Sequence, residues 1–412
     1  MSTPQQPGLS RVRVNLALAT LFLGTFVLGT AELGVVGMLN LIADDVGVSI
    51  SAAGMLVTAY ALGLAIGGPV LAVLTIRLDR RVLLSSTLLA YLAATLLVLV
   101  PDFGLLIVAR ALTGSLHGLF IGVAFTIAVS VVPPQRVGRA LAVVIAGFAV
   151  SAALGLPLGT LIGQTVGWRG AFATFVVIGA VCLIATLAII PRVPPTGAGG
   201  IAAQVRHALA PRVLAVLGLA FLLFTGQYAA LTYITTFLEQ VTGISGGVIS
   251  VFLFAYGAAT AVGVFAGGRF ADKAASRTLI VATAALIAVL GVLYLAGALP
   301  ILVAASLILF GLFGMGLVPS LQYRVVSLAG PGHSLAETLP ASTINAGIAV
   351  GALAGGWAIA NYSPSSVVLV GLVICIVALP VAWATSTLKS AEDSETLPTR
   401  GETTETATEA ER

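Results

Sequence analysis

Twelve long apolar runs dominate the sequence, and each is long enough to cross a lipid bilayer. A helix rises about 1.5 Å per residue, so about 20 residues span a hydrocarbon core of about 30 Å. The runs are continuously apolar, which favours helices over the alternating strands of an outer-membrane barrel. Only 8% of the residues are charged, against roughly 25% in soluble globular chains. The sequence therefore predicts an all-α integral membrane protein.

In chain order, the expected spans are 14–39, 52–76, 82–100, 103–131, 138–165, 170–190, 212–238, 246–268, 278–299, 300–322, 337–360 and 365–387. We interpret the first run as a retained span, because it is longer than the core of a signal peptide. With twelve spans, both termini lie on one side. The basic residues near the spans fall on that side, and Arg169 alone falls on the other. The positive-inside rule then predicts a cell-membrane protein with cytoplasmic N- and C-termini.

Composition divides the chain into two halves. Prolines and glycines after residue 190 predict a flexible cytoplasmic linker at 191–211. It would join a six-helix half at 14–190 to a second six-helix half at 212–387. Residues 1–13 are expected to form a short cytoplasmic N-terminus. The Thr- and Glu-rich residues 388–412 are expected to form a disordered cytoplasmic tail.

The two halves resemble each other in sequence. A shift of 196 residues lays Ala59-Tyr60 on Ala255-Tyr256, Gly67 on Gly263, Arg77 on Lys273, Arg81 on Arg277 and Leu83 on Leu279. Coincident basic residues in equivalent loops are hard to obtain from apolar composition alone. We therefore expect two pseudo-symmetric six-helix bundles, an arrangement in which many secondary transporters hold a substrate cavity near the membrane midplane.

A single carboxylate, Glu32, lies inside the first span. An ionised carboxylate there costs several kcal/mol unless it is paired or solvated. Arg110 lies about seven residues from the outer start of the fourth span, and Glu32 about seven from the outer end of the first, so both lie roughly 10 Å below the outer surface. Their matching depth makes them a candidate ion pair for proton coupling. The alternative is a fixed tie between two helices.

Polar residues recur at helical spacing in three spans. Thr113 and His117 share a face of the fourth span with Arg110. The seventh span carries a stripe of Thr225, Tyr228, Thr232, Thr235 and Glu239, and the eleventh carries Thr338, Ser342 and Asn345. A polar stripe on an apolar helix should face a cavity or a partner helix. We expect the substrate cavity to be lined by His117, Thr113, Tyr228, Thr232, Thr235, Asn345 and Ser342, with interhelical hydrogen bonds as the alternative.

Four segments together resemble the major facilitator superfamily. They are the loop at 74–81 with its copy at 268–273, the span-four stretch at 110–118, the span-five stretch at 147–163 and the span-seven stretch at 225–239. The likeness covers about residues 14–387. It is specifically to the twelve-span drug:proton antiporter branch, with its sugar-efflux and chloramphenicol-export-like members.

The resemblance implies further site residues. The loop is similar to the family's Gly-x-Leu-Ala-Asp-Arg-x-Gly-Arg-Arg, whose Asp latches one conformation. Ile76 stands at the Asp position of the first copy, whereas the second copy keeps Asp272. The implied latch residues are Asp272, Arg269, Lys273, Arg77 and Arg81, which could instead be simple positive-inside anchors. Gly155, Pro157 and Gly159 look like the antiporter motif and are the implied hinge, a role compatible with close helix packing.

Several functional classes are not indicated by the sequence. It contains no Gly-x-x-x-x-Gly-Lys-Ser/Thr phosphate loop and no Cys/His cluster with zinc spacing. We therefore expect no enzyme activity, catalytic residue, metal or cofactor, and no nucleic-acid partner. The expected energy source is a proton gradient, used by a monomer in the lipid bilayer.

The function that follows is proton-coupled efflux of a small amphiphilic compound, such as an antibiotic or drug, by alternating access. Glu32 would meet Arg110 in one state and substrate or solvent in another, so its affinity for protons would change with conformation. Three alternatives stay open: efflux of sugars or nucleosides, a uniporter or importer of the same fold, and a membrane sensor or scaffold. The sensor or scaffold would need more soluble surface than the short inside loops provide.

Overall fold

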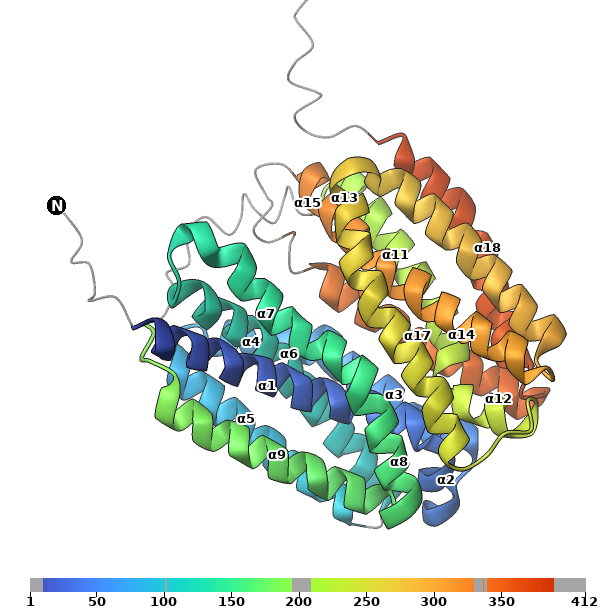
Figure 1. Ribbon diagram of the computed structural model, residues 1–412, viewed down its shortest axis with the longest axis horizontal. Coiled ribbons are helices and arrows are strands. Elements are labelled where there is room, and N and C mark those ends of the chain that lie inside the picture. The colour runs from blue at the N-terminus through green and yellow to red at the C-terminus, as the bar shows by residue number, and fades with distance from the viewer. Residues whose placement is uncertain (1–9, 101, 195–208, 330–335, 337–338, 389–412) are drawn as a thin grey trace, which may run out of the picture.

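The computed structural model describes residues 10–100, 102–194, 209–329, 336 and 339–388. Over these ranges the chain is helical, and twelve helices are long and apolar enough to cross a membrane (Figure 1). The predicted fold class is confirmed. The tail beyond Leu388 and most of the linker, residues 195–208, lie outside the described residues, as does Thr338.

The first six spans are α1 (Arg11–Gly37), α3 to α4 (Ile50–Leu74), α5 with η2 (Arg80–Leu99), α6 (Phe103–Ser130), α7 to α8 (Val137–Val166) and α9 (Trp168–Ile189). A short helix, α2 (Leu39–Val46), follows α1. The next six are α11 to α12 (Pro211–Gln240), the two parts of α13 (Gly247–Ala271 and Lys273–Ala296), α14 to α15 (Pro300–Ala329), α17 (Leu339–Asn361) and α18 (Ser366–Ser386). These helices match the predicted spans one for one. The largest difference is at the tenth span, which continues to Ala329 instead of ending near residue 322.

Two spans contain a π-helical turn that ends two residues before a proline. The turn η1 (Gly63–Gly67) precedes Pro69, and the turn η4 (Ser151–Gly155) precedes Pro157. Proline has no N–H, and its ring crowds the carbonyl one turn earlier, so the hydrogen-bond ladder widens at that point. The predicted hinge region around Pro157 is therefore a local break in regular α-helix.

The internal repeat is visible in the packing of two glycines. A Cβ atom on Gly114 of α6 would overlap the carbonyl of Tyr60 in α3. A Cβ atom on Gly311 of α14 would likewise overlap the carbonyl of Tyr256 in α13. Because Tyr60 and Tyr256 are the residues that the repeat equates, both halves use the same glycine-on-backbone contact to bring two spans together.

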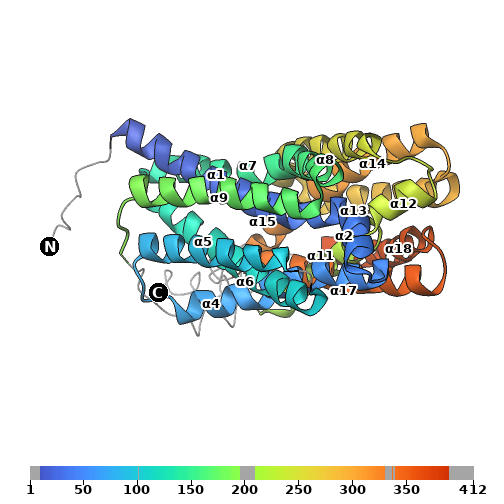
Figure 2. The same cartoon turned by 90° about the horizontal axis from the view of Figure 1, so that it is seen from below.

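The two halves lie side by side (Figure 1) and meet toward the end of the molecule where α1 finishes. There α3 packs on α17, and η4 and α8 pack on α13. Thr58 donates to the carbonyl of Ala349 across this interface, at 3.3 Å. The short elements α2 and α12 (Ile234–Gln240) meet at the same end, opposite the N-terminus (Figure 2).

A surface cluster fixes α2 against the start of α9. Trp168 Nε1 donates to Asp45 Oδ2 at 3.1 Å, and Arg169 pairs with the same carboxylate. The Arg169 guanidinium also lies 4.3 Å from the centre of the Trp168 ring. Hydrogen bonds from Arg169 and Trp168 hold the pKa of Asp45 below its usual value. These contacts hold the segment that follows the first span against the start of α9.

The glycine contact in the first half gives a stability prediction. Gly114→Ala should lower the thermal midpoint of the purified protein, because the new methyl group meets backbone that cannot move alone; overpacking of this kind costs about 1–3 kcal/mol. Gly122→Ala, on the same helix, is the matched control, because a Cβ atom there meets nothing within 4 Å. Thermal unfolding in detergent would measure both. Equal midpoints for the two variants would contradict the proposed contact.

Candidate functional site

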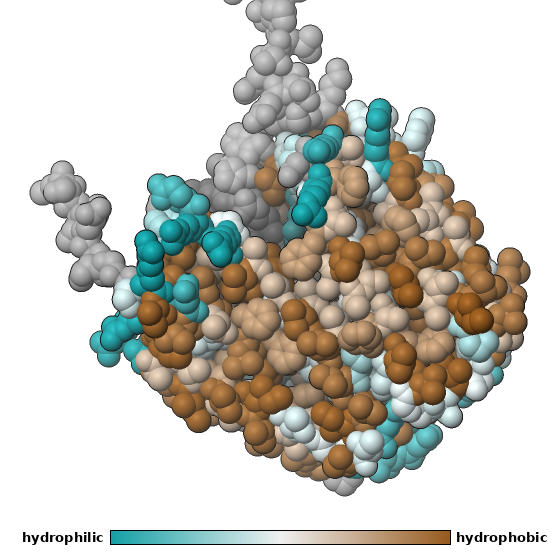
Figure 3. Space-filling view, viewed as in Figure 1, coloured by the Kyte–Doolittle hydropathy of each residue, from teal (hydrophilic) through white to brown (hydrophobic). Residues whose placement is uncertain are grey.

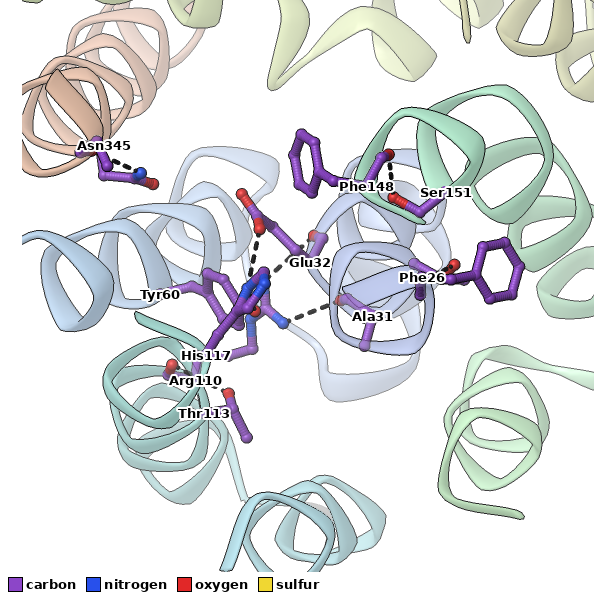
Figure 4. A network of polar contacts seen from close by, with 12 residues as sticks. Phe26, Ala31, Glu32, Tyr60, Arg110, Thr113, His117, Phe148, Ser151 and Asn345 are labelled. Atoms are coloured by element: carbon purple, nitrogen blue, oxygen red, sulfur yellow. Dashed lines mark hydrogen bonds and ion pairs between the residues drawn. The ribbon is translucent and has the colours of Figure 1, made fainter. Parts of the chain in front are cut away.

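Four ionisable or polar side chains meet inside the first half: Glu32 of α1, Tyr60 of α3, and Arg110 and His117 of α6 (Figure 4). The side chain of Glu32 is 13% exposed and that of His117 only 1%. Charged groups buried among membrane helices are costly and mark functional sites by default. We call these four residues the central cluster.

The Arg110 guanidinium is buried and binds the main chain. It donates to the carbonyls of Ala31 at 3.1 Å, Glu32 at 3.3 Å and Leu56 at 3.3 Å. It also lies over the Tyr60 ring, 4.1 Å from its centre. Carbonyl dipoles and an aromatic face together replace the water that the cation has lost. Arg110 thereby joins α6 to both α1 and α3.

The Glu32 carboxylate contacts His117, not Arg110. Glu32 Oε2 lies 3.2 Å from His117 Nδ1, and no ion pair joins Glu32 to Arg110 among the interactions of the described residues. Arg110 does reach the level of Glu32 on α1, where it donates to the carbonyl of Glu32. The predicted carboxylate–guanidinium pair is replaced by a carboxylate–imidazole pair.

The direction of side chains on a helix explains why Glu32 contacts His117 instead of Arg110. Side chains tilt toward the N-terminus of their own helix, and α1 and α6 run in opposite directions. The Glu32 side chain therefore leans away from the level of its Cα toward the start of α1. His117, two turns further along α6 than Arg110, leans back toward Glu32. The two side chains meet between their backbone levels.

His117 Nδ1 is shared between two oxygens. The Tyr60 hydroxyl lies 2.6 Å from it. An unprotonated Nδ1 accepts from Tyr60, whereas a protonated Nδ1 donates to the Glu32 carboxylate. His117 Nε2 is buried and has no hydrogen-bond partner among the described residues. The contact can therefore exist in two arrangements that differ in whether Nδ1 carries a proton.

A small cavity of about 10 Å³ adjoins the central cluster. Its walls come from both halves: Glu32, Leu33, Val36, Val57, Tyr60, Ala61 and Arg110 from the first, and Tyr228 and Ile348 from the second. A volume of this size holds about one water molecule. In this conformation the halves have closed around the cluster, and a substrate would need them to separate.

The other predicted cavity residues lie at different places. Tyr228 lines the small cavity, whereas the hydroxyl of Thr113 bonds to its own helix at Ala109, 2.8 Å away. Thr232 is buried, and its hydroxyl has no partner among the described residues. Ser342 is half-buried on α17. Thr235 donates to the carbonyl of Val36 at 3.2 Å, which is the interhelical hydrogen bond named as the alternative.

Asn345 of α17 lies near the central cluster in Figure 4. Its amide nitrogen donates to the carbonyl of Ala341 at 3.0 Å, and its side chain is buried. Its amide oxygen has no partner within the described part of the chain. An unpaired buried oxygen is available to a ligand, so Asn345 keeps its place among the predicted substrate contacts.

The predicted latch residues lie away from the central cluster. Arg81 donates to the carbonyl of Leu187 at the end of α9, and Asp79 caps α5 by accepting from the backbone N–H groups of Arg81 and Val82 at 3.0 and 3.1 Å. Arg77 is exposed. This loop is thus tied to its own half.

In the second copy, Arg269 and Lys273 are exposed beside a break in α13 at Ala274, where φ is −158° and ψ is 48°. The side chain of Asp272 lies outside the described residues, so the latch stays a prediction.

The predicted hinge residues lie against α1 and α9. A Cβ atom on Gly155 would overlap the side chain of Thr30 in α1, and one on Gly159 would lie 3.0 Å from the Phe175 ring in α9. Across the interface, a Cβ atom on Gly257 of α13 would overlap the backbone of Ala152 in η4. The π-helical turn therefore sits at a close backbone contact between the two halves.

A second polar cluster joins the halves, and the sequence reasoning missed it. Thr236 Oγ1 donates to Asn40 Oδ1 at 2.5 Å, and Asn40 Nδ2 donates to the Glu239 carboxylate. With the bond from Thr235 to Val36, these contacts form what we call the closed end. Glu239 is the last residue of the predicted stripe on the seventh span, whereas Asn40 was not among the predicted site residues. The internal repeat could have identified Asn40, since a shift of 196 residues pairs it with Thr236, its hydrogen-bond partner.

The chain matches the Major Facilitator Superfamily over residues 21–339. It belongs to this family. It is 31% identical over 346 residues to the Bacillus subtilis (strain 168) protein named "Uncharacterized MFS-type transporter YtbD", covering 82% of this chain and 87% of that one. It is also 31% identical over 380 residues to the "Inner membrane transport protein YdhP" of Escherichia coli (strain K12), covering 89% and 95%. The chain is therefore an MFS-type membrane transporter.

Solved structures share the fold at low sequence identity. A bacterial homolog of the human lysosomal transporter Spinster, inward-facing and unoccupied, superposes with a TM-score of 0.71 at 19% identity, covering 92% of this chain and 98% of that one. The peptide transporter POT in complex with sulfate gives a TM-score of 0.73 at 14% identity, covering 90% and 93%. At such identities the likeness concerns the fold alone.

The closed end gives a prediction about access. Asn40→Ala should loosen it, because a hydrogen bond to a charged group contributes about 1.5–3 kcal/mol. A cysteine at the buried position Val36 should then react with a thiol reagent about tenfold faster, since 1.4 kcal/mol changes a population tenfold. The native Cys182 and Cys375 are buried and give a low background.

Asn361→Ala is the control for this test, because Asn361 lies at the end of α17 and its hydrogen bond within the described residues stays in its own helix, at Trp357. Equal labelling rates in Asn40→Ala and in Asn361→Ala would show that Asn40 does not hold the halves together.

Proposed function

We propose that this transporter is a proton-coupled antiporter that exports a small amphiphilic compound by alternating access. It would act as a monomer in the cell membrane, with both termini in the cytoplasm. The observation that carries the proposal is the contact between Glu32 and His117 beside a cavity whose walls come from both halves. Two titratable groups that are in contact near the interface where the two halves move can bind a proton in one state and release it in another.

The positions of the basic residues support an orientation for this cycle. Arg11, Arg136 and Arg139 lie at the end where α1 begins, and Arg169 lies at the end where α2 joins α9. By the positive-inside rule, the first end faces the cytoplasm and the closed end faces outward. The described conformation would then be closed to the outside.

The proposed exchange uses the proton shared by Glu32, His117 and Tyr60. In an outward-open state, water would reach Glu32 and protonate the carboxyl–imidazole pair while substrate leaves. In an inward-open state, the pair would lose that proton to the cytoplasm and substrate would enter. Arg110 would supply a fixed positive charge that compensates the ionised carboxylate while the site is dry.

Substrate contacts on the second half are expected to be uncharged. Tyr228 and Ile348 face the central cluster, and Thr232 and Asn345 each keep a buried polar atom without a partner among the described residues. Mixed aromatic, aliphatic and hydroxyl or amide groups suit an uncharged or weakly charged amphiphile. A growth screen of a deletion strain against antibiotics, sugars and nucleosides would identify the compound.

Replacing Glu32 with Gln tests the coupling. The variant keeps size and hydrogen bonding but cannot ionise. In proteoliposomes it should still exchange labelled substrate for unlabelled, while uphill transport driven by a proton gradient falls at least about tenfold, within the usual range of coupling energies between sites.

Asp102→Asn is the control for Glu32→Gln, because Asp102 only caps the start of α6, at the backbone N–H of Leu105. Unchanged substrate-induced proton movement in Glu32→Gln would refute proton antiport at this site. It would favour a uniporter instead.

His117 should be needed for the same transport. Substituting His117 with Asn removes the imidazole that contacts both Glu32 and Tyr60 while leaving one donor and one acceptor. Gradient-driven transport should fall at least about tenfold, within the usual range of coupling energies between sites, while exchange of labelled for unlabelled substrate is kept. Unchanged gradient-driven transport in His117→Asn would show that the imidazole is only a structural partner of Glu32.

A further inference from the structure

A large cavity lies far from the closed end. Its volume is about 900 Å³, and it opens between the start of α1, the end of α6 and the start of α7. Its lining residues are Arg11, Val14, Asn15, Leu18, Ala19, Phe22, Ser130, Val131, Val132, Pro133, Arg136, Arg139, Ala140 and Val143. None of these described residues belongs to the central cluster or lines the small cavity beside it, so the two cavities are separate. The proposed transport cycle does not use it.

Among the described residues that line this cavity, every charged group is positive. Arg11, Arg136 and Arg139 line it, together with the amide of Asn15, and no carboxylate is among the lining residues. Among the described residues, no Asp or Glu forms an ion pair with any of the three guanidinium groups. Figure 3 shows hydrophilic side chains gathered where α1 and α7 begin, beside a broad apolar flank. The cavity therefore presents unpaired cations next to apolar surface.

Helical spacing makes these groups converge. Arg11, Asn15 and Leu18 follow one another at steps of four and three, so they share a face of α1, which continues to Phe22. Arg136 and Arg139 are three residues apart at the start of α7. The two faces turn toward one another across the cavity. Arginine groups on separate helices can thus hold one anion between them.

The depth of the cavity fits a lipid molecule. The cavity lies where two membrane spans begin and a third ends, which is the level of the lipid headgroups. From Arg11 to Phe22 the helix rises roughly 16 Å toward the membrane interior. The arginines therefore lie at headgroup level, and Leu18, Phe22 and Val143 lie at the level of the first part of an acyl chain.

We propose that this cavity binds an anionic phospholipid from the leaflet at this end of the molecule. The guanidinium groups would hold the headgroup phosphate, since their planar fork suits phosphate oxygens. The amide of Asn15 would donate to a headgroup or ester oxygen, and the apolar residues would cover the chain. The cytoplasmic leaflet is the anionic one, which agrees with the orientation proposed above.

Binding to the full-length purified protein in detergent tests this proposal. Native mass spectrometry would count the phosphatidylglycerol and phosphatidylcholine molecules retained during titration, and thermal unfolding would follow stabilisation. Wild type should prefer phosphatidylglycerol at least about tenfold, as expected for roughly 1 kcal/mol per basic residue. The double variant Arg136→Gln/Arg139→Gln should lose most of this preference. Equal retention of the two lipids by wild type would overturn the proposal.

The control distinguishes lipid binding in this cavity from a general attraction of anionic lipid to positive charge on the protein. The double variant Arg77→Gln/Arg269→Gln removes two exposed basic residues that do not line the cavity, and it should keep the preference for phosphatidylglycerol. An equal loss in both double variants would overturn the proposal. Leu18→Trp tests the site without changing any charge, because the larger ring fills the apolar part of the cavity. It should reduce retention of phosphatidylglycerol, and unchanged retention would count against an acyl chain there.

A further arm distinguishes lipid from a soluble anion. Inorganic phosphate alone, at millimolar concentration, should neither stabilise wild type nor displace phosphatidylglycerol. If phosphate alone stabilises wild type as much as the lipid does, and does so through Arg136 and Arg139, the cavity is a site for soluble anions and the lipid proposal is wrong. These measurements need no transported substrate, so their outcome is independent of the antiport proposal.

Discussion

The central cluster depends on how the charge of Arg110 is kept inside the membrane. A guanidinium cannot be neutralised there, and three main-chain carbonyls and the face of Tyr60 take the place of its water. Because these carbonyls belong to α1 and α3, the cation ties both helices to α6. It does so without using the Glu32 carboxylate. The carboxylate is thus left to His117, a partner that can gain or lose a proton.

Arg110 binds main-chain carbonyls while His117 contacts the Glu32 carboxylate, and this arrangement affects how Glu32 can exchange a proton. If Arg110 were bonded directly to the carboxylate, the pair would be held in its ionised form, and protonation would have to break it. A carboxyl–imidazole pair can instead exchange one proton with small movements, since Tyr60 is ready to take the place of Glu32 at Nδ1. The fixed charge of Arg110, two helix turns from His117 along α6, still compensates the ionised form.

Much of the fold followed from the sequence, because lipid imposes a simple rule: each span must satisfy its own backbone hydrogen bonds and present apolar side chains. The twelve spans and the depths of Glu32 and Arg110 rest on this rule. The partner of Glu32 did not follow, because spacing along a helix gives the level of a Cα atom but not the direction of its side chain. Thr235 shows the same limit, since a polar stripe does not say whether a hydroxyl faces a cavity or a neighbouring carbonyl. Asn40 was missed because one amide near the end of a span is unremarkable until its partner on another helix is known.

The internal repeat explains why the closed end and the small cavity beside the central cluster lie one above the other. Residues related by a twofold axis can touch each other only near that axis. Asn40 and Thr236 are separated by the repeat shift of 196 residues and are hydrogen-bonded to each other, so the axis passes through the closed end. The same shift relates Glu32 to Tyr228, and both line the small cavity.

The symmetry of the backbone is not matched by the chemistry of the side chains. In the second half, the shift lays Tyr228 on Glu32, and the paired glycine contacts of Gly114 and Gly311 lay Leu307 on Arg110 and Gly314 on His117. Two halves that share a fold therefore face the same axis with different surfaces: an ionisable one on the first half and a neutral one on the second. A rotation about the shared interface would change the surroundings of the ionisable groups while the neutral half keeps its own contacts. A coupled transporter requires this asymmetry, because one movement of the halves must change both the binding of the proton, at the ionisable groups, and the binding of the substrate, at the neutral ones.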